Sequence, residues 1–278
     1  MANFAVRLKW NMILSQLVAP LKNVFKDNNR LERIWLLAKI DFSKRYYGSK
    51  LGLFWALLNP LLKVGIYFFA FEIIMGGTTI EYFAVYLFAG LIIWLFFTEA
   101  VSRSMNLLKS KRYLTSNIQF SWHDLFYSQM VSSLLGFLFN MMAFSIWCLY
   151  YGLVPGLTIV FFPILVFNLV LTSLGFAYVF AILKLYLNDI QHIWALLVLA
   201  GFWTAPIFFR GQDIAKNLPW LNYVHPGSAL IINFRKVIMY GEHPDYSLFF
   251  SALVYGLVVW VIGRKIFDIY SVKAIDRI

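Results

Sequence analysis

Apolar residues are concentrated in six blocks of the 278-residue chain, and short polar stretches separate the blocks. A helix needs about 20 mostly apolar residues to cross a membrane. Six blocks meet this requirement, at approximately 51–75, 83–101, 125–150, 157–183, 192–209 and 246–263. No internal repeat and no Pro-rich or Gly/Ser-rich linker divides them. The pattern predicts an all-α integral membrane protein with six transmembrane helices, made of an N-terminal segment (1–50) and one membrane domain (51–278).

The residues before the first span predict an amphipathic helix that begins near Asp27–Asn29, where helix-capping residues cluster. Its apolar face collects residues at helical spacing, namely Leu31, Ile34, Trp35, Ala38 and Phe42. An interfacial helix has this pattern. Leu36, Leu37 and Ile40 interrupt the polar face, so we also expect this helix to contact protein on its second side. A simple positively charged anchor is the alternative interpretation.

The stretch at about 211–241 is apolar in two short pieces that prolines interrupt. Each piece is too short to cross a membrane, and the second carries Arg235 and Lys236. A seventh crossing would also separate the basic C-terminal tail from the basic N-terminal segment. We therefore expect a hairpin that re-enters the outer leaflet between spans five and six. Such backbone is tolerated in a membrane only where protein or a water-filled cavity surrounds it.

Composition supports a membrane protein and its charge sets the orientation. Hydrophobic residues make up 61% of the chain and charged residues only 13%, against about 25% charged in soluble domains. The net charge of +11 indicates orientation and gives no reason to expect nucleic acid, because 19 of the 24 Lys and Arg residues fall on one predicted side. By the positive-inside rule both termini are cytosolic.

No catalytic or metal-binding pattern stands out. The Gly48-Ser49-Lys50 stretch lacks the earlier glycine of a phosphate-binding loop and runs into an apolar span. The four histidines are scattered without the spacing of metal ligands. A membrane-embedded glycan transferase would need carboxylates or histidines gathered at one membrane face, and the sequence shows none. We expect no cofactor or metal on this chain and no enzymatic activity of its own.

Two charged features lie within or beside the spans. Lys63 is twelve residues into the first span, and an ionisable residue at such depth is a functional candidate. The alternative is that its side chain reaches toward a headgroup or bonds the carbonyls freed by Pro60. Glu99 and Arg103 are four residues apart at the end of the second span, a spacing that predicts a surface ion pair.

Three motifs resemble the permease subunits of ABC transporters that export O-antigen, teichoic acid or capsular polysaccharide. They are "KRYYGSKLGLFWALLNPLL" from residue 44, "LNDIQHIWALLVLAGFWTAPIFF" at 187–209 and "YVHPGSALIINFRKVIMYG" at 223–241. The last carries Pro226 and Arg235 in the places that the family's outer hairpin has them. The chain departs from the family at Asn188-Asp189, where Arg-Asp is usual, and at Lys63, where an apolar residue is expected.

The resemblance implies a homodimer in the bacterial inner membrane that binds two copies of a separate ATPase, which would hold ATP and magnesium. The substrate would be a glycan on a polyprenyl-pyrophosphate carrier, surrounded by membrane lipids, with no nucleic acid involved. Cytosolic segments 105–121 and 185–192 would dock on the ATPase; the candidate residues are Lys109, Lys111, Arg112, Tyr113, Asn188, Asp189 and His192. Export of a small amphiphile or drug by the same fold is the alternative.

Two site hypotheses follow. Lys44, Arg45 and Lys50 lie where a span meets the cytosolic leaflet, so they are candidates to bind the pyrophosphate; positive-inside anchoring without a ligand is the alternative. Aromatic rings in the spans are candidates to line a glycan channel together with Lys63; the alternative is that they face lipid or pack between helices. These rings are Tyr67, Phe68, Phe71, Trp94, Phe97, Trp203 and Phe208.

Overall fold

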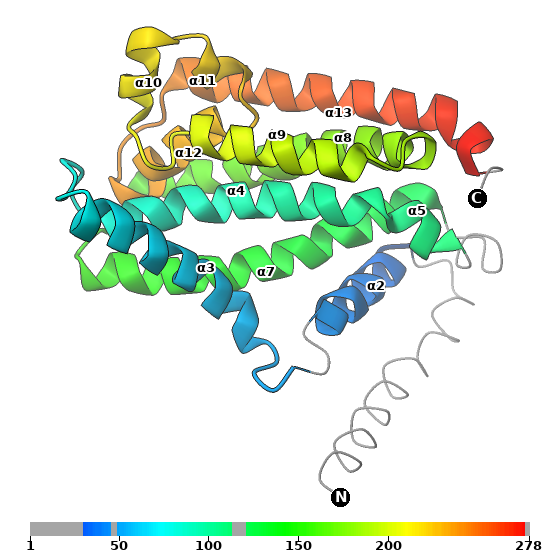
Figure 1. Cartoon of the computed structure of the whole chain (residues 1–278), viewed down its shortest axis with the longest axis horizontal. Coiled ribbons are helices and arrows are strands. Elements are labelled where there is room, and N and C mark those ends of the chain that lie inside the picture. The colour runs from blue at the N-terminus through cyan, green and yellow to red at the C-terminus, as the bar shows by residue number, and fades with distance from the viewer. Residues whose placement is uncertain (1–29, 46–48, 113–120, 276–278) are drawn as a thin grey trace, which may run out of the picture.

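The computed structural model describes residues 30–45, 49–112 and 121–275, and regular structure in these ranges is entirely helical. Figure 1 shows long helices that lie side by side, with short helices gathered at one end. The elements are α2 (Arg30–Arg45), α3 (Phe54–Phe68), η1 (Phe69–Ile74), α4 (Phe83–Met105), α5 (Leu107–Ser110), α7 (Trp122–Tyr150), η2 (Leu157–Phe161), α8 (Phe162–Tyr186), α9 (Ile190–Thr204), α10 (Gly211–Asn217), α11 (Leu221–Val224), α12 (Ser228–Phe234), η3 (Arg235–Met239) and α13 (Tyr246–Ile275).

Five helical segments are long and apolar enough to cross a membrane: Phe54–Ile74, Phe83–Met105, Trp122–Tyr150, Leu157–Tyr186 and Tyr246–Ser271. The remaining predicted span, 192–209, forms the 15-residue helix α9, which ends before the extended residue Ala205, and the chain then continues through a turn and bends. Pro206 explains this end, because proline disfavours helical backbone at the residue before it. Five of the six predicted spans are thus confirmed as apolar helices of sufficient length, and the sixth stays a prediction.

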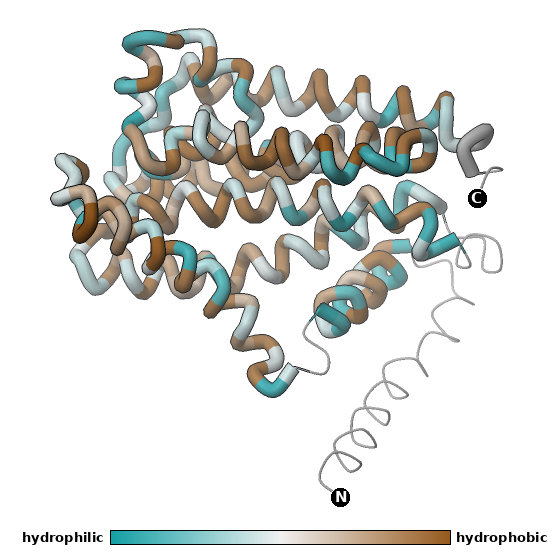
Figure 2. Tube along the Cα trace, in the orientation of Figure 1, coloured by the Kyte–Doolittle hydropathy of each residue, from teal (hydrophilic) through white to brown (hydrophobic). Residues whose placement is uncertain are grey.

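Helix α4 is the centre of the bundle, and most of its side chains are buried. It packs against α3, α7, α8 and α9. Apolar residues also cover the outside of the bundle, on α9 and α13 among others, as the hydropathy colours of Figure 2 show. Apolar residues inside and outside together are what a chain surrounded by lipid requires, since lipid tails are as apolar as the core.

The most extensive helix contact joins α8 to α13, and glycines make it possible. A Cβ atom on Gly263 would lie 2.3 Å from the carbonyl oxygen of Gly175 across the interface. A Cβ on Gly256 would lie 2.1 Å from Asn168 Oδ1. Small residues at these positions let two membrane helices approach closely without a hydrophobic force between them.

Helix α2 packs against α7, so the predicted protein contact is confirmed, whereas the interfacial position of its apolar face stays a prediction. Leu37 and Ile40, which interrupt the polar face, are buried. Leu31 and Trp35 are exposed, although their spacing placed them with the buried Ile34, Ala38 and Phe42. Contact with α7 therefore rotates the buried face toward Leu37 and Ile40. The predicted helix start at 27–29 lies outside the described residues.

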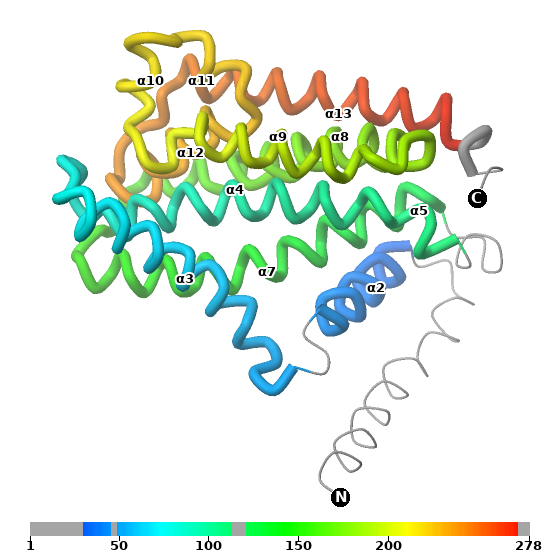
Figure 3. The backbone as a smooth tube through the Cα atoms, in the orientation of Figure 1, coloured from blue at the N-terminus to red at the C-terminus, as the bar shows by residue number. Residues whose placement is uncertain are grey.

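The stretch from 211 to 241 is broken into α10, α11, α12 and η3 at one end of the bundle. These short helices lie at the end opposite to α5 and to the last turns of α13 (Figure 3). We call the end that carries α5 the α2 end, because the first residue of α2, Arg30, bonds Asp124 in the first turn of α7 there. The arrangement places α2 and the last turns of α13 toward the same end, and the membrane placement of the hairpin stays a prediction.

Candidate functional site

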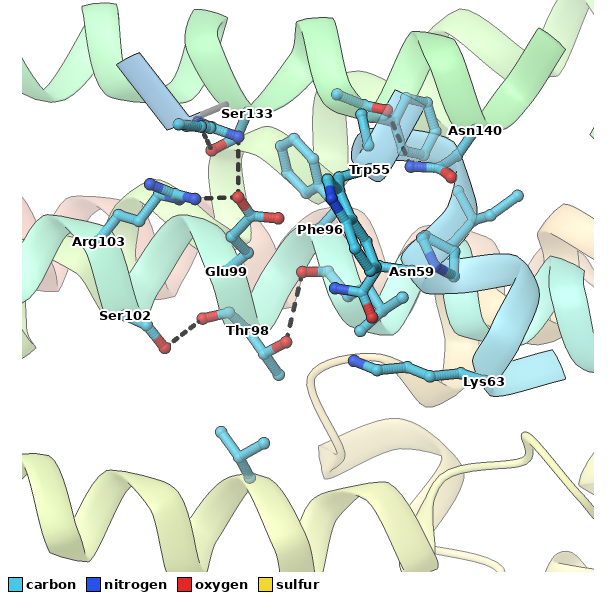
Figure 4. A pocket seen from close by; sticks show the side chains of 18 of the residues that line it. Trp55, Asn59, Lys63, Phe96, Thr98, Glu99, Ser102, Arg103, Ser133 and Asn140 are labelled. Atoms are coloured by element: carbon cyan, nitrogen blue, oxygen red, sulfur yellow. Dashed lines mark hydrogen bonds and ion pairs between the residues drawn. The ribbon is translucent and has the colours of Figure 1, made fainter. Parts of the chain in front are cut away.

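A cavity of about 800 Å³ opens among α3, α4 and α7 and reaches toward α9 (Figure 4). It extends along α4 from Arg103 to Ile92, which is roughly 16 Å at 1.5 Å of rise per residue. Its lining mixes aromatic rings with charged and amide groups: Arg45, Trp55, Asn59, Lys63, Phe96, Glu99, Arg103, Ser133, Phe137 and Asn140 are the principal contributors.

Helical spacing brings these side chains together. On α3, Trp55, Asn59 and Lys63 recur every four residues and so share one face. On α7, Ser133, Phe137 and Asn140 follow at spacings of four and three residues and so also share one face. The resulting cavity combines aromatic rings with polar and charged side chains, a composition found in ligand sites.

Arg45 enters the cavity at the α2 end and is held by three groups. Its Nη1 donates to Glu99 Oε1 at 2.8 Å, and its Nη2 donates to Ser132 Oγ at 2.9 Å and to Ser133 Oγ at 3.4 Å. Only 3% of the Arg45 side chain is exposed, compared with 43% for Glu99. Glu99 also accepts from Arg103 Nε at 2.7 Å, so the predicted surface ion pair is confirmed. The structure adds Arg45 as a third member.

Lys63 lies at the other end of the cavity from Arg103 and extends from α3 into the space between α4 and α9 (Figure 4). Its ammonium group makes no hydrogen bond or ion pair with any other residue that the structure describes. Among the described residues, the cavity lining therefore holds three cations, Arg45, Lys63 and Arg103, against the single carboxylate of Glu99. This imbalance favours an anionic ligand.

A second cavity of about 230 Å³ adjoins the first, because Arg45 and Arg103 line both. Lys44 and Lys111 add two more cations there, beside Asp41. Lys111 Nζ forms an ion pair with Asp41 and so connects the end of α5 to α2. The α2 end of the protein thus carries basic groups around two adjacent cavities.

The three predicted pyrophosphate residues, Lys44, Arg45 and Lys50, differ in whether they line a cavity. Arg45 lines both cavities and Lys44 lines the smaller one, whereas Lys50 is exposed and lines neither.

The predicted channel aromatics fall into three groups in the structure. Tyr67, Phe71 and Trp203 all contact Phe208, with ring centroids 4.8–5.1 Å apart. Trp94 and Phe97 are buried in the core, and Phe68 is part-exposed elsewhere on α3.

The predicted ATPase-docking residues lie at the surface of the α2 end. Lys109 and Arg112 are exposed at α5, and Asn188, Asp189 and His192 are exposed around the start of α9. Lys111 is the exception, since it turns toward Asp41. Tyr113 and the loop that follows it lie outside the described residues.

Arg235, predicted to lie in the hairpin, is buried at the opposite end and bonds only backbone carbonyls among the described residues. Its Nε and Nη2 donate to Tyr86 O at 3.1 and 2.8 Å, and Nη2 also donates to Ile207 O at 3.1 Å. Nη1 donates to Pro206 O. The guanidinium carbon lies 3.3 Å from the centre of the Tyr86 ring. Arg235 thereby ties η3 to α4 and to the turn after α9, and Pro226 is part-buried between α11 and α12.

Sequence reasoning missed Trp55, Asn59, Ser133 and Asn140 as cavity residues. A signal was present, because Ser133 and Asn140 are polar residues seven apart inside an apolar span, a spacing that puts them on one helix face. Asn59 is likewise four residues before Lys63. Polar residues at helical spacing inside a span mark a face that avoids lipid.

Comparison with known proteins identifies the family. Residues 32–239 match the family of ABC-2 type transporters. Two proteins of Klebsiella pneumoniae named O-antigen export system permease protein RfbA are 25% and 24% identical over 229 residues, covering 82% of this chain and 88% of theirs. A protein of the same name from Myxococcus xanthus is 25% identical over 236 residues, covering 84% of this chain and 90% of its own.

Proposed function

The chain belongs to the ABC-2 type transporter family of membrane permeases, which implies an ATP-binding partner subunit, and from this we propose that it exports a lipid-linked polysaccharide. The relatives that match most of its length are named for O-antigen export. In this proposal the chain is the membrane-spanning half of an inner-membrane exporter, works as a homodimer and binds two copies of the ATPase. Both termini are cytosolic.

The observation that carries the proposal is the cavity at the α2 end, because its chemistry fits a lipid pyrophosphate. Arginine binds phosphate oxygens in a planar, two-bond geometry, and Arg45 and Arg103 both border the cavity. Trp55, Phe96 and Phe137 supply apolar walls for the adjoining hydrocarbon or for sugar faces. In this proposal the headgroup site consists of Arg45 and Arg103 with Lys44 nearby, and Lys50 acts at the surface only.

The aromatic cluster of Tyr67, Phe71, Trp203 and Phe208 supports a second part of the proposal. Aromatic rings offer flat surfaces on which sugar rings slide without fixed hydrogen bonds, and half of the Trp203 surface is exposed. Trp94, Phe97 and Phe208 have little exposed surface, so we assign them to packing. The rings of Tyr67, Phe71 and Trp203, which contact Phe208, would line the glycan path where two copies of the chain meet.

Purification from the native cell with the partner ATPase, followed by mass spectrometry of bound lipid, tests the substrate. We expect a glycan on a polyprenyl-pyrophosphate carrier; a small amphiphile in its place would favour the alternative function.

Arg45→Met should lower export at least about tenfold, since a charge-assisted contact to the pyrophosphate is lost. Arg30→Met is the matched control, because Arg30 also ties α2 to α7, through Asp124, but lines neither cavity.

A further inference from the structure

Lys63 is a cation about halfway along the first span. It is nine residues past Phe54, the first residue of α3, or roughly 14 Å along the helix axis. Its side chain extends into the large cavity (Figure 4). The cavity ends near it, while Arg45 and Arg103 occupy the opposite end.

The usual ways to neutralise such a charge are not used among the described residues. Glu99, the one carboxylate of the cavity, already accepts from Arg45 and Arg103. Glu72, further along the same span, accepts from Thr78. Pro60 frees a carbonyl of the preceding helical turn, yet Lys63 donates to no backbone oxygen in the described part of the chain. An ammonium group in an apolar surrounding is unfavourable unless an anion or hydrogen-bond acceptors surround it.

Two side-chain amides in the same cavity, those of Asn59 and Asn140, are also available to bind a polar ligand. Asn59 lies one helical turn before Lys63 on the same face, and its amide makes no hydrogen bond to another described residue. Asn140 Oδ1 on the opposite wall is buried and accepts no hydrogen bond from the residues that the structure describes. A hydroxyl group would satisfy Asn140, and an anion would satisfy Lys63. A phosphate or carboxylate next to a sugar offers both.

We propose that Lys63 is the inner anion-binding position of this cavity. An anionic group first bound at Arg45 and Arg103 pairs next with Lys63, halfway across the span, before it moves further. The inference rests on the proposed function for the direction of travel. Its physical basis is that an unpaired anion in hydrocarbon is highly unfavourable, so a second cation at mid-depth shortens the distance over which the anion is unpaired.

The anion has two sources in an exporter of this kind. One is the pyrophosphate of the lipid carrier, which passes Lys63 once. The other is an acidic sugar repeated along the polymer, which passes it many times. The shared chemistry is a phosphate or carboxylate oxygen that accepts from the Lys63 ammonium, and two pairs of probes separate the sources. Geranyl pyrophosphate is compared with geraniol, and trigalacturonate with maltotriose.

The first experiment observes Lys63 directly in the full-length protein in phosphatidylcholine nanodiscs. Lysines are reductively methylated with ¹³C, and the resonance lost in Lys63→Arg identifies Lys63. We expect this resonance to shift saturably with geranyl pyrophosphate, trigalacturonate or both, and not with the neutral partners. The resonance of Lys216, an exposed lysine outside both cavities, should stay in place. A Lys63 resonance that neither anion moves overturns the proposal.

The second experiment separates the inner position from the outer one. Binding of the effective probe is measured by equilibrium dialysis in an Arg45→Met background, with empty nanodiscs as the blank. Adding Lys63→Met should weaken binding roughly tenfold further, whereas Lys63→Arg and Lys216→Met should leave it within about threefold. Equal weakening by Lys63→Met and Lys63→Arg, with both variants monodisperse, means that shape and not charge matters, and the proposal is then wrong. Lys63→Gln replaces Lys63→Met if the latter does not fold.

The Lys63 experiments and the identification of the exported molecule test different proposals, and either proposal can fail alone. If mass spectrometry finds no glycan while the Lys63 resonance responds to an anion, the proposed function fails and the anion site stands. If a glycan is found while Lys63 responds to neither anion, only the inner position is overturned.

Discussion

Two arginines with almost no exposed surface lie at opposite ends of α4, and they are used differently. Arg235 bonds three backbone carbonyls at the hairpin end. Arg45 bonds a carboxylate and two serine hydroxyls at the α2 end and borders a cavity. Their partners on α4, Tyr86 and Glu99, are thirteen residues apart, or roughly 20 Å.

The two sets of partners indicate different roles: Arg235 has a structural role, whereas Arg45 has a partner that an incoming anion can replace. Carbonyls of the backbone cannot move away without unfolding local structure, so Arg235 fixes η3 against α4 and the turn after α9. The Glu99 side chain is 43% exposed and has Arg103 as a second partner, so it need not hold Arg45 permanently. In the proposed function, an anion that enters the cavity exchanges with Glu99 for the same guanidinium.

Replacement of Arg235 by methionine should have the largest effect on stability. It removes the bonds of three carbonyls that stay buried, each costing about 1–3 kcal/mol, so we expect the free energy of unfolding to fall by about 3 kcal/mol or more. Equilibrium denaturation in mixed micelles measures this. Lys236→Met, one residue further along η3, is the control and should change stability little. If Arg235→Met is as stable as the wild type, the hairpin is held by packing alone.

The sequence predicted the helices well and the cavity poorly, for physical reasons. Span positions follow from the length of apolar runs, which depends on neighbours in sequence. The end of the predicted fifth span was placed beyond Thr204 because its residues stay apolar, while Pro206 stops the helix. Lys63 was identified by its depth alone. Its distance from Arg45, and the absence of a described partner, depend on how α3 packs against α4 and α7, which no local pattern encodes.

Glycines beside Arg235 and Arg45 give a second test of how tightly each arginine is confined, and we expect a smaller change in the free energy of unfolding than for Arg235→Met. A Cβ on Gly90 would lie 2.6 Å from Arg235 Nη2 and 3.4 Å from the Cα of Ile207. A Cβ on Gly136 would make ordinary contact with Arg45 Nη1, at 3.7 Å. We expect Gly90→Ala to lower the free energy of unfolding by about 1–3 kcal/mol through overpacking.

Gly136→Ala should leave the free energy of unfolding unchanged or raise it by up to about 1 kcal/mol, because alanine favours helix over glycine. The same denaturation assay measures both variants, and Gly65→Ala, with open space around the new methyl group, calibrates the helix preference. Equal losses at Gly90 and Gly136 would show that the two arginines are equally confined, contrary to the comparison.

The pair Asp41–Lys111 should show the clearest separation of roles. Its side chains are only 15% and 16% exposed, so removing one charge leaves the other mostly buried and unpaired, and either neutral variant, Asp41→Asn or Lys111→Gln, should lower the free energy of unfolding by about 1–3 kcal/mol. If Lys111 docks on the ATPase, Lys111→Gln should weaken capture of the ATPase by the immobilised permease, and Asp41→Asn should not, since it releases Lys111 without removing its charge. Equal weakening by both would instead show that the ion pair itself orients α5 from α2. The α2 end would then transmit the position of α2 to the ATPase, a role for which the rigid bonds of Arg235 at the other end are unsuited.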